Sequence, residues 1–452
     1  MVPLSLLLLA LALIGSTTTM MGVAAVAVFF LGGVLLWRAG ESPILLFIFA
    51  YQWLQIVVAI FYAGWLGIDL NDYSTFHGDM QMAATLSLTG LALLICGMRL
   101  GAGPAQPQDA QLARLAVSRS QTKNWFGLYF AFWMLGALAQ AIALVVHGLS
   151  QPLLALGSMR WAFFLILTYA AFCTGVRSYW LIAFALELVS SVGSYFADFK
   201  TVFFFTIFGL VASQVRLKLR DYLGLAVLAT CVLGMAIVWS DIKMEYRRSG
   251  GGIGKMVDLV SQVDGAGMSR GLDLLIRRIG YIEFFAAVVN HVPNVVPYTK
   301  GAIWADAIAR PFMPRMFSPE KSIIDDSART NMYTGLHESG LESGTSITIG
   351  YMGETYIDFG PLWMMPVIGG FGYFIGRIYR HLLRSPPSRG PLGMGLASAV
   401  LFQTAVYEQS ITKELGAIIV MLLVSWALIR FVIPTWAPWV QQSYSGTRQE
   451  SV

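Results

Sequence analysis

Charged residues are scarce in this sequence. Asp, Glu, Lys and Arg make up 12% of its 452 residues, whereas 56% are hydrophobic and the mean hydropathy is +0.65. A soluble domain usually carries about 25% charged residues. A deficit spread along the whole chain therefore excludes an ordinary soluble enzyme and indicates a polytopic membrane protein. The formal net charge of +5 does not predict a nucleic-acid partner, since in this class basic residues mostly mark loops that stay in the cytoplasm.

Cysteine is almost absent too. Cys96, Cys173 and Cys231 lie in apolar runs without Cys-x-x-Cys or Cys/His spacing, so we expect neither a disulfide framework nor a zinc site. The sequence also lacks a P-loop, a Gly-x-Gly-x-x-Gly run that opens a helix, Gly-x-Ser-x-Gly and His-Glu-x-x-His. No carboxylates have the spacing of a cation cage, and we predict no metal and no cofactor.

Long apolar runs are what the sequence has instead. Because a helix crosses the hydrocarbon core with about 20 apolar residues, these runs predict an all-α polytopic membrane protein with about 12 transmembrane helices. The predicted spans lie near residues 2–16, 20–37, 43–66, 80–98, 124–147, 161–176, 178–196, 201–214, 222–240, 359–376, 391–408 and 414–433. Since no Lys or Arg precedes the first run, we expect a retained helical hairpin over 2–37 rather than a signal peptide, with one long tilted span as the alternative.

The distribution of Lys and Arg predicts the orientation. Loops 99–123, 214–221 and 377–389 are rich in basic residues and should face the cytoplasm, whereas 67–79 carries three aspartates and no Lys or Arg. With twelve spans, both termini lie inside and 241–358 lies outside, which is the periplasm for a bacterial inner membrane. The predicted domains are transmembrane helices 1–9 in 1–240, a periplasmic loop in 241–358, transmembrane helices 10–12 in 359–433 and a cytoplasmic tail in 434–452.

The outer segment should be partly helical. Apolar residues from Leu272 to Ala286 recur at helical spacing and predict an amphipathic helix over 270–290. Arg278 lies at the edge of its apolar stripe, so it is the arginine there that we expect to be partly desolvated. Several prolines then predict mostly loop with short helices over 292–345.

Cations of the outer segment could bind phosphate, because arginine offers a bidentate fork and lysine a point charge. Several of them converging would suit a pyrophosphate leaving group and neutralise it as its bond breaks. The predicted pyrophosphate-binding residues are Arg278, Arg315 and Lys321, with Arg248 and Arg160 as further contacts. The wider set of outer cations includes Arg247, Arg270, Arg277, Arg310 and Arg329. The alternative for each is a pair with a local acid or a lipid headgroup.

Acid and base candidates lie in the same segment. A glycosyl or acyl transfer needs a group that takes a proton from the attacking hydroxyl, and imidazoles and carboxylates can do so near neutral pH. His337 adjoins a glycine-rich run, and Glu354 shares a helical face with Asp358 before the next span. We predict Glu354 and His337 as the catalytic residues. An exposed helix start, where acids favour the helix dipole, is the alternative for Glu354 and Asp358.

Glu187 is an unusual acidic residue, because it lies within a predicted transmembrane span, where charged side chains are rare. A carboxylate at membrane depth is costly and is either functional or paired inside the bundle. Arg160 is its natural partner, or else a phosphate contact at the end of its own span. A structural tie between helices is therefore an open alternative to a role in transport.

Short motifs in the outer segment follow one another in a characteristic order. They are Arg278-Ile279-Gly280, Val292-Pro293, Tyr298-Thr299-Lys300-Gly301, Pro314-Arg315-Met316-Phe317-Ser318-Pro319-Glu320-Lys321, Gly344-Thr345-Ser346 and Gly353-Glu354-Thr355-Tyr356-Ile357-Asp358-Phe359-Gly360. This order resembles the O-antigen polymerase (Wzy-type) family of oligosaccharide repeat-unit polymerases. These are integral membrane enzymes that make bacterial surface polysaccharides. The family's central run usually has Trp near the position of Phe317-Ser318, and often Pro at the position of Ser322.

The resemblance implies a polysaccharide polymerase, of O-antigen or exopolysaccharide type, that acts as a glycosyltransferase on lipid-linked glycans. It implies undecaprenyl-pyrophosphate-linked oligosaccharide as substrate, and it marks Arg278, Arg315, Lys321, Glu354 and Gly360 as positions to test. We expect membrane lipid as a partner, a chain-length regulator and a flippase as further partners, and no nucleic acid. The aromatic residues predicted to bind sugar are Tyr298, Trp304 and Tyr356. The alternatives are a lipid-linked glycan ligase, a polysaccharide transporter or flippase, and a non-catalytic scaffold.

Overall fold

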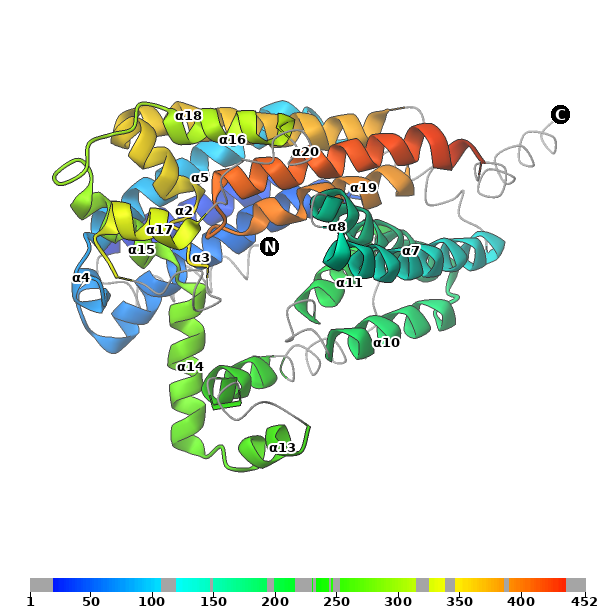
Figure 1. The fold of residues 1–452 in the computed structure, drawn as a ribbon, viewed down its shortest axis with the longest axis horizontal. Coiled ribbons are helices and arrows are strands. Elements are labelled where there is room, and N and C mark those ends of the chain that lie inside the picture. Colours follow the sequence, from blue (N-terminus) through cyan, green and yellow to red (C-terminus); the bar gives the residue numbers. More distant parts are fainter. Residues whose placement is uncertain are drawn as a thin grey trace.

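The structure is a computed structural model, and its described residues form helices and no strand. It describes residues 19–106, 119–146, 149–192, 199–215, 230, 233–243, 245–246, 253–313, 325–337, 346–385 and 390–435. Figure 1 shows α5, α18 and α20 running in roughly the same direction, with α14 crosswise to them. The described part of the chain is thus an all-α protein, as the sequence predicts.

The N-terminal half consists mainly of apolar helices. They are α2 (Thr19–Leu36), α3 (Ile44–Leu66), α4 (Leu70–Tyr73), α5 (Met80–Ala102), α7 (Arg119–Val145), α8 (Ser150–Ser158), α9 (Arg160–Thr174), α10 (Ser178–Val192) and α11 (Phe199–Ser213). The second half begins with shorter helices and ends with longer ones. They are α13 (Ile253–Ser261), α14 (Gly265–Ile279), α15 (Ile282–His291), α16 (Ala302–Ala309), η2 (Arg310–Phe312), α17 (Asp326–Thr334), α18 (Tyr351–Arg384), α19 (Pro391–Leu401), η5 (Phe402–Ala405), α20 (Ile411–Ala427) and η6 (Leu428–Val432).

Six helical segments in the described ranges are long and apolar enough to cross a membrane. They are Ile44–Leu66, Met80–Ala102, Arg119–Val145, Ser150–Thr174, Tyr351–Arg384 and Ile411–Thr435. Shorter apolar helices, at Met20–Leu36, Ser178–Ser190, Lys200–Ser213 and Pro391–Ala405, coincide with four more of the predicted spans. The prediction of a membrane protein is confirmed at this level, and the count of about twelve spans stays a prediction. The predicted span 2–16 and part of the predicted span 222–240 lie outside the described residues.

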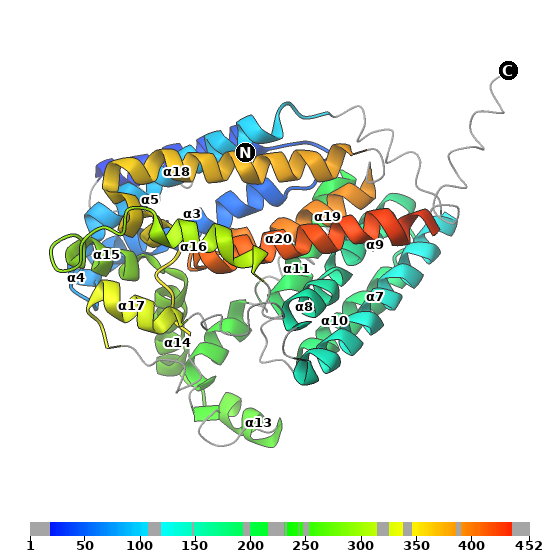
Figure 2. The same ribbon diagram turned by 45° about the horizontal axis from the view of Figure 1, so that its top comes forward.

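The closest helix packing joins α5 to α18, which lie side by side in both ribbon views (Figure 2). A Cβ atom on Gly97 would lie 2.1 Å from the carbonyl oxygen of Gly369. One on Gly372 would lie 2.3 Å from the carbonyl oxygen of Leu94. Small residues let two backbones approach this closely, which is a common basis of helix association in membranes.

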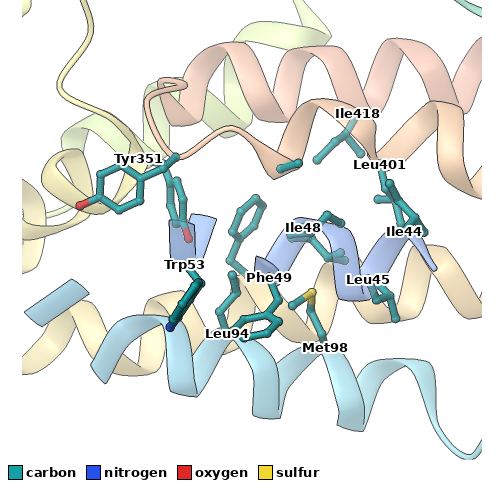
Figure 3. Packing of buried hydrophobic residues seen from close by; sticks show 14 of the residues in the cluster. Ile44, Leu45, Ile48, Phe49, Trp53, Leu94, Met98, Tyr351, Leu401 and Ile418 are labelled. Atoms are coloured by element: carbon teal, nitrogen blue, oxygen red, sulfur yellow. The ribbon is translucent and has the colours of Figure 1, made fainter. Parts of the chain in front are cut away.

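The centre of the bundle is α3, which is surrounded on several sides. Figure 3 shows Ile44, Ile48 and Phe49 of α3 packed among Leu94 and Met98 of α5, Leu401 of α19 and Ile418 of α20, all of them buried. A helix that is covered in this way needs apolar residues around its circumference. The sequence of α3 therefore shows little amphipathicity, and its few polar residues are buried with specific partners.

Polar residues gather at the two ends of this bundle. At one end the Arg38 guanidinium donates to Glu41 (Nε–Oε2 2.6 Å) and to the Gly103 carbonyl (2.8 Å), and the Tyr379 hydroxyl donates to Glu41 (3.0 Å). At the other end, the segment between α4 and α5 contacts α15, where the Thr75 amide donates to Glu283 (3.0 Å). Gly103 and Tyr379, the described parts of two loops predicted to be cytoplasmic, thus lie at the opposite end of α3 and α5 from the acidic loop 67–79.

The predicted amphipathic helix over 270–290 is two helices, α14 and α15, separated at Gly280 (φ −75°, ψ 69°). The prediction that Arg278 is the partly desolvated arginine is wrong, because Arg278 is exposed and Arg277 is half-buried. The Arg277 guanidinium lies 4.8 Å from the centre of the Tyr73 ring and 3.1 Å from Asp273. The segment that carries Tyr73, which is distant in sequence, covers the face of α14 that the hydrophobic pattern of α14 predicts to be polar.

Helix α18 begins earlier than the predicted span and contains a break. Gly360 has φ 71° and ψ −179°, a backbone conformation that favours glycine, and Pro361 follows it. The rings of Tyr351 and Phe371 lie 5.6 Å apart although they are far apart along α18. The first part of α18, residues 351–359, therefore folds back against the second part, which carries Glu354 and Asp358 into the buried interior.

Candidate functional site

The candidate site surrounds the short irregular segment from Val406 to Ser410, between η5 and α20. Gln55, near the middle of α3, holds this segment through both ends of its amide. Its Oε1 accepts from the Tyr407 amide at 2.8 Å, and its Nε2 donates to the Glu408 carboxylate at 3.4 Å. Ser410 then caps α20, since its hydroxyl oxygen accepts from the Lys413 amide (3.4 Å). The apolar helices thus expose one acidic side chain, Glu408, at a defined position.

Two cations act on Glu408. Lys200 lies at the start of α11, with its ammonium 5.9 Å from the centre of the Tyr51 ring, and Arg278 lies in the last turn of α14. Burial raises the pKa of Glu408, and the positive charges of Lys200 and Arg278 lower that pKa by a smaller amount. Both cations are exposed, and neither makes an ion pair with a described residue, Glu408 included. Within the described part of the chain, their charges are available to a ligand.

Residues 346–350 tie the outer segment to this site. The Tyr281 hydroxyl donates to the Thr348 carbonyl at 2.8 Å, and the Thr348 hydroxyl donates to the Glu408 carbonyl. Burial, together with the nearby negative charge of Glu408, raises the pKa of Tyr281 to about 12. Tyr281 is therefore a neutral hydrogen-bond donor throughout the physiological pH range.

A second ionic group lies at the start of α20. Arg329 of α17 donates to Glu354 (Nη1–Oε1 2.8 Å), whose other oxygen accepts from the Ile411 amide (2.7 Å). The Glu354 side chain is 1% exposed, so both of its oxygens are engaged by the protein itself. Lys413 pairs with Asp326 in the same region. This arrangement makes Glu354 the residue that positions Arg329 and the first turn of α20.

The predicted site residues are separated by the fold. Arg278 and Glu354 belong to the two groups just described, whereas His337 is exposed beyond the end of α17 and makes no hydrogen bond to a described residue. Arg160 lies 3.7 Å from Glu187, which also accepts from the Tyr129 hydroxyl at 2.9 Å. The geometry favours the alternative that we left open for Glu187, a tie between helices. Three predicted pyrophosphate contacts lie outside the described residues: Arg248, Arg315 and Lys321.

The three predicted sugar-binding aromatics all lie near the first part of α18. Tyr356 is 4% exposed, packs on Phe285 and donates to the Val292 carbonyl (3.2 Å), so its ring has no free face in this structure. Tyr298 packs edge-on against Tyr356, with ring centres 5.9 Å apart. Trp304 donates to the Thr355 hydroxyl (3.0 Å). Tyr298 and Trp304 are each half-buried and keep part of their surface accessible.

Asp358 is not at an exposed helix start. It is 2% exposed, and its carboxylate accepts from the backbone amides of Ile303 (3.1 Å) and Trp304 (2.8 Å). These amides belong to the first turn of α16, whose N–H groups have no partner within the helix. Asp358 therefore fastens α16, and with it Trp304, onto α18.

Sequence reasoning missed several charged residues of the site. They are Glu408, Lys413 and Glu414, whereas Lys200 was noticed only as part of the charged cluster Asp198-Phe199-Lys200. The signal for the three missed residues was present, because they are charged residues between two long apolar runs, where each charge is costly. Lys200 stands beside Asp198 at the start of an apolar run, which gave no reason to connect it with residue 408.

No family model, curated protein or solved structure matches this chain. A function for the site is therefore argued from the chemistry of its own residues and from the order of motifs in the sequence.

Proposed function

We propose that this chain is a polysaccharide polymerase, a glycosyltransferase that joins undecaprenyl-pyrophosphate-linked oligosaccharide repeat units. The supporting observation is that two exposed cations, Arg278 and Lys200, act on one partly buried carboxylate, Glu408, without being neutralised by another described acid. A glycosyl transfer from a lipid pyrophosphate needs these two components together: cations for the leaving group and a base for the attacking hydroxyl.

In the proposed reaction a sugar hydroxyl of one lipid-linked unit attacks the anomeric carbon of the other. The new bond joins the hydroxyl oxygen to that carbon, and the bond from the carbon to the pyrophosphate oxygen breaks. Its electron pair leaves with the pyrophosphate. Arg278 would bind this group through its fork and Lys200 as a point charge. Glu408 would take the proton of the attacking hydroxyl, and burial suits it to this role by raising its pKa toward neutrality.

Glu354 has a supporting role in this proposal. Its oxygens accept from Arg329 and from the Ile411 amide, so it orients groups near the site while Glu408 takes the base role that we first assigned to Glu354 and His337. Arg315 and Lys321 stay in the proposal as further phosphate contacts. Replacing Arg315 by Ala is expected to abolish long chains and to let single repeat units accumulate in cells.

We further propose that the site faces the periplasm of a bacterial inner membrane, within about twelve spans. The supporting observation is that Arg384, from one loop predicted to be cytoplasmic, donates to the Pro104 carbonyl of another, at the other end of the bundle. Arg38 donates to the carbonyls of Gly103 and Pro104 at the same end. Labelling of single cysteines at positions 278 and 384 with a membrane-impermeant maleimide in intact cells tests this. Labelling at 278 alone is expected, and labelling at 384 alone contradicts it.

The decisive experiment incubates the purified protein with lipid-linked repeat unit as the only substrate and resolves the products by chain length. We expect a ladder from the wild-type chain and a loss of about a hundredfold in rate for Glu408→Gln. Arg278→Ala and Lys200→Ala should each slow elongation. Arg270→Ala is the matched control, because Arg270 is an exposed arginine of the same helix that pairs with Asp241 instead (3.2 Å). A normal ladder from Glu408→Gln contradicts the proposal.

The same assay separates the alternatives. A ligase transfers the glycan only when a second kind of acceptor is added, so it gives no ladder from repeat unit alone. A transporter moves the substrate across the bilayer without lengthening it. The buried group that favours transport, Glu187 with Arg160 and Tyr129, should then be essential for that movement.

A further inference from the structure

Glu414, in the first turn of α20, is buried in an unusual way. Its side chain is 0% exposed, and neither carboxylate oxygen has a hydrogen-bond partner among the described residues. Other acids of this region have cations: Glu354 has Arg329 and Asp326 has Lys413. A buried carboxylate without a partner is strongly unfavourable when ionised, and such groups take up a proton instead.

The surroundings of Glu414 supply no compensating positive charge. The charged group that acts on it is the carboxylate of Glu354, on α18, and the neighbouring Tyr351 hydroxyl is directed to Gln52 (2.9 Å). Among the other elements packed against α20, Asp306 of α16 pairs with Arg310 of η2 (2.7 Å), and α8, α19 and η5 carry no charged residue. Arg430 of η6 lies beyond the opposite end of α20 from Glu414. Lys413, on α20 itself, pairs with Asp326.

We propose that Glu414 is a proton-binding site that is occupied at neutral pH and whose charge is coupled to that of Glu354, without a hydrogen bond between the two. Two buried carboxyl groups that repel each other do not both ionise, so this pair carries one proton and one negative charge. Arg329 balances that charge through its contact with Glu354. The charge of the pair and the position of the Arg329 guanidinium are then linked.

This linkage gives the pair a role in binding an anion. When a pyrophosphate draws the Arg329 guanidinium away from Glu354, the remaining negative charge of the pair is buried without a cation. The pair then takes up a second proton from the solvent, by formation of one O–H bond on Glu354. This coupling rests on the proposed function, which supplies pyrophosphate as the anion, and it adds the half-buried Arg329 to the phosphate contacts proposed there. The protonation of Glu414 is independent of both.

Infrared spectroscopy of the purified full-length protein tests the protonation. A protonated buried carboxylic acid has a carbonyl stretch separate from those of carboxylates and amides, and we expect Glu414→Gln to lose that band. Glu283→Gln is the matched control: Glu283 is also buried but accepts from Thr75 (3.0 and 2.8 Å), and its replacement should leave the band unchanged. A spectrum that Glu414→Gln does not alter in this region overturns the proposal.

A second measurement needs no variant. Dicyclohexylcarbodiimide reacts with protonated carboxyl groups in apolar surroundings, so mass spectrometry should find its adduct on the peptide that contains Glu414 at neutral pH. Protein that is labelled only at other acids contradicts the protonation. Glu414→Gln should also match the wild-type chain in thermal stability, because an amide replaces a neutral acid of the same shape.

The coupling is tested by calorimetric titration with pyrophosphate in buffers of different ionisation enthalpy. We expect the uptake of about one proton for each pyrophosphate bound in the wild-type chain, and much less in Glu354→Gln. Binding without proton uptake overturns the coupling but leaves the proposed function intact. Absence of binding contradicts both the coupling and the phosphate site of the proposed function, while the infrared band and the carbodiimide adduct still decide the protonation of Glu414.

Discussion

Arg329 and Glu354 lie 2.8 Å apart, and their contact joins three separate parts of the chain. Arg329 comes from α17, in the predicted outer segment, and Glu354 from the first part of α18. The second oxygen of Glu354 accepts from the Ile411 amide, which starts α20. One carboxylate thus holds the outer segment against the two helices that end the bundle.

Removing one member of this pair should destabilise the protein more than removing both. Arg329→Leu leaves the Glu354 carboxylate buried without its cation, and losses of about 3–5 kcal/mol are typical of such sites. The double variant with Glu354→Gln should recover much of that loss. Unfolding in detergent, compared at one scan rate, measures the difference. A loss in the double variant equal to the sum of the two single-variant losses would show that the pair is not coupled.

The pH dependence of elongation should report Glu408. Burial raises its pKa above the ordinary carboxyl value of 4.5, so kcat/KM should rise with pH at a midpoint above that value, as the base loses its proton. Arg278→Ala removes a charge that lowers this pKa and should move the midpoint to higher pH. The free energy of unfolding should change with pH in the opposite direction to kcat/KM. Because the folded protein binds a proton at Glu408 more tightly than the unfolded chain does, the fold becomes less stable as the pH rises through that range. An unchanged midpoint in Arg278→Ala contradicts the assignment.

The packing of α5 against α18 should be sensitive to one methyl group. A Cβ at position 372 would lie 2.3 Å from the Leu94 carbonyl oxygen, so Gly372→Ala must separate the helices and should cost about 1–3 kcal/mol or more. Gly370→Ala is the matched control on the same helix, with nothing within 4 Å of the new atom. That control should be neutral or slightly stabilising, because Ala favours a helix by about 1 kcal/mol over Gly. Similar unfolding curves for both variants would contradict this packing.

Glu187 should matter for stability and not for chemistry. It accepts from the Tyr129 hydroxyl (2.9 Å) and lies 3.7 Å from Arg160, which connects α7, α9 and α10. We expect Glu187→Gln to lower the thermal unfolding midpoint while the surviving folded protein elongates chains at the wild-type rate. Loss of elongation at normal stability would instead indicate a direct role in the reaction or in transport.

The positions of the apolar helices could be predicted from the sequence. Runs such as 43–66 and 80–98 correspond closely to Ile44–Leu66 and Met80–Ala102, because the length and polarity of a membrane-embedded helix are local properties of the chain. Glu354 and Arg278 were identifiable for a similar reason, since charged residues are few. The prediction of one helix over 270–290 was only partly correct, because Gly280 and Tyr281 interrupt it.

The grouping of the polar residues was decided by tertiary structure alone. Whether Arg277 or Arg278 is covered depends on Tyr73, more than two hundred residues earlier, and whether Tyr356 has a free face depends on Phe285 and Val292. Glu408 becomes a candidate base only because folding brings Gln55, Lys200 and Arg278 to it. The burial of a side chain and its electrostatic partners depend on contacts between segments that are distant in sequence. The hydrophobic pattern of a segment predicts that the segment will pack, but it does not predict against which neighbour.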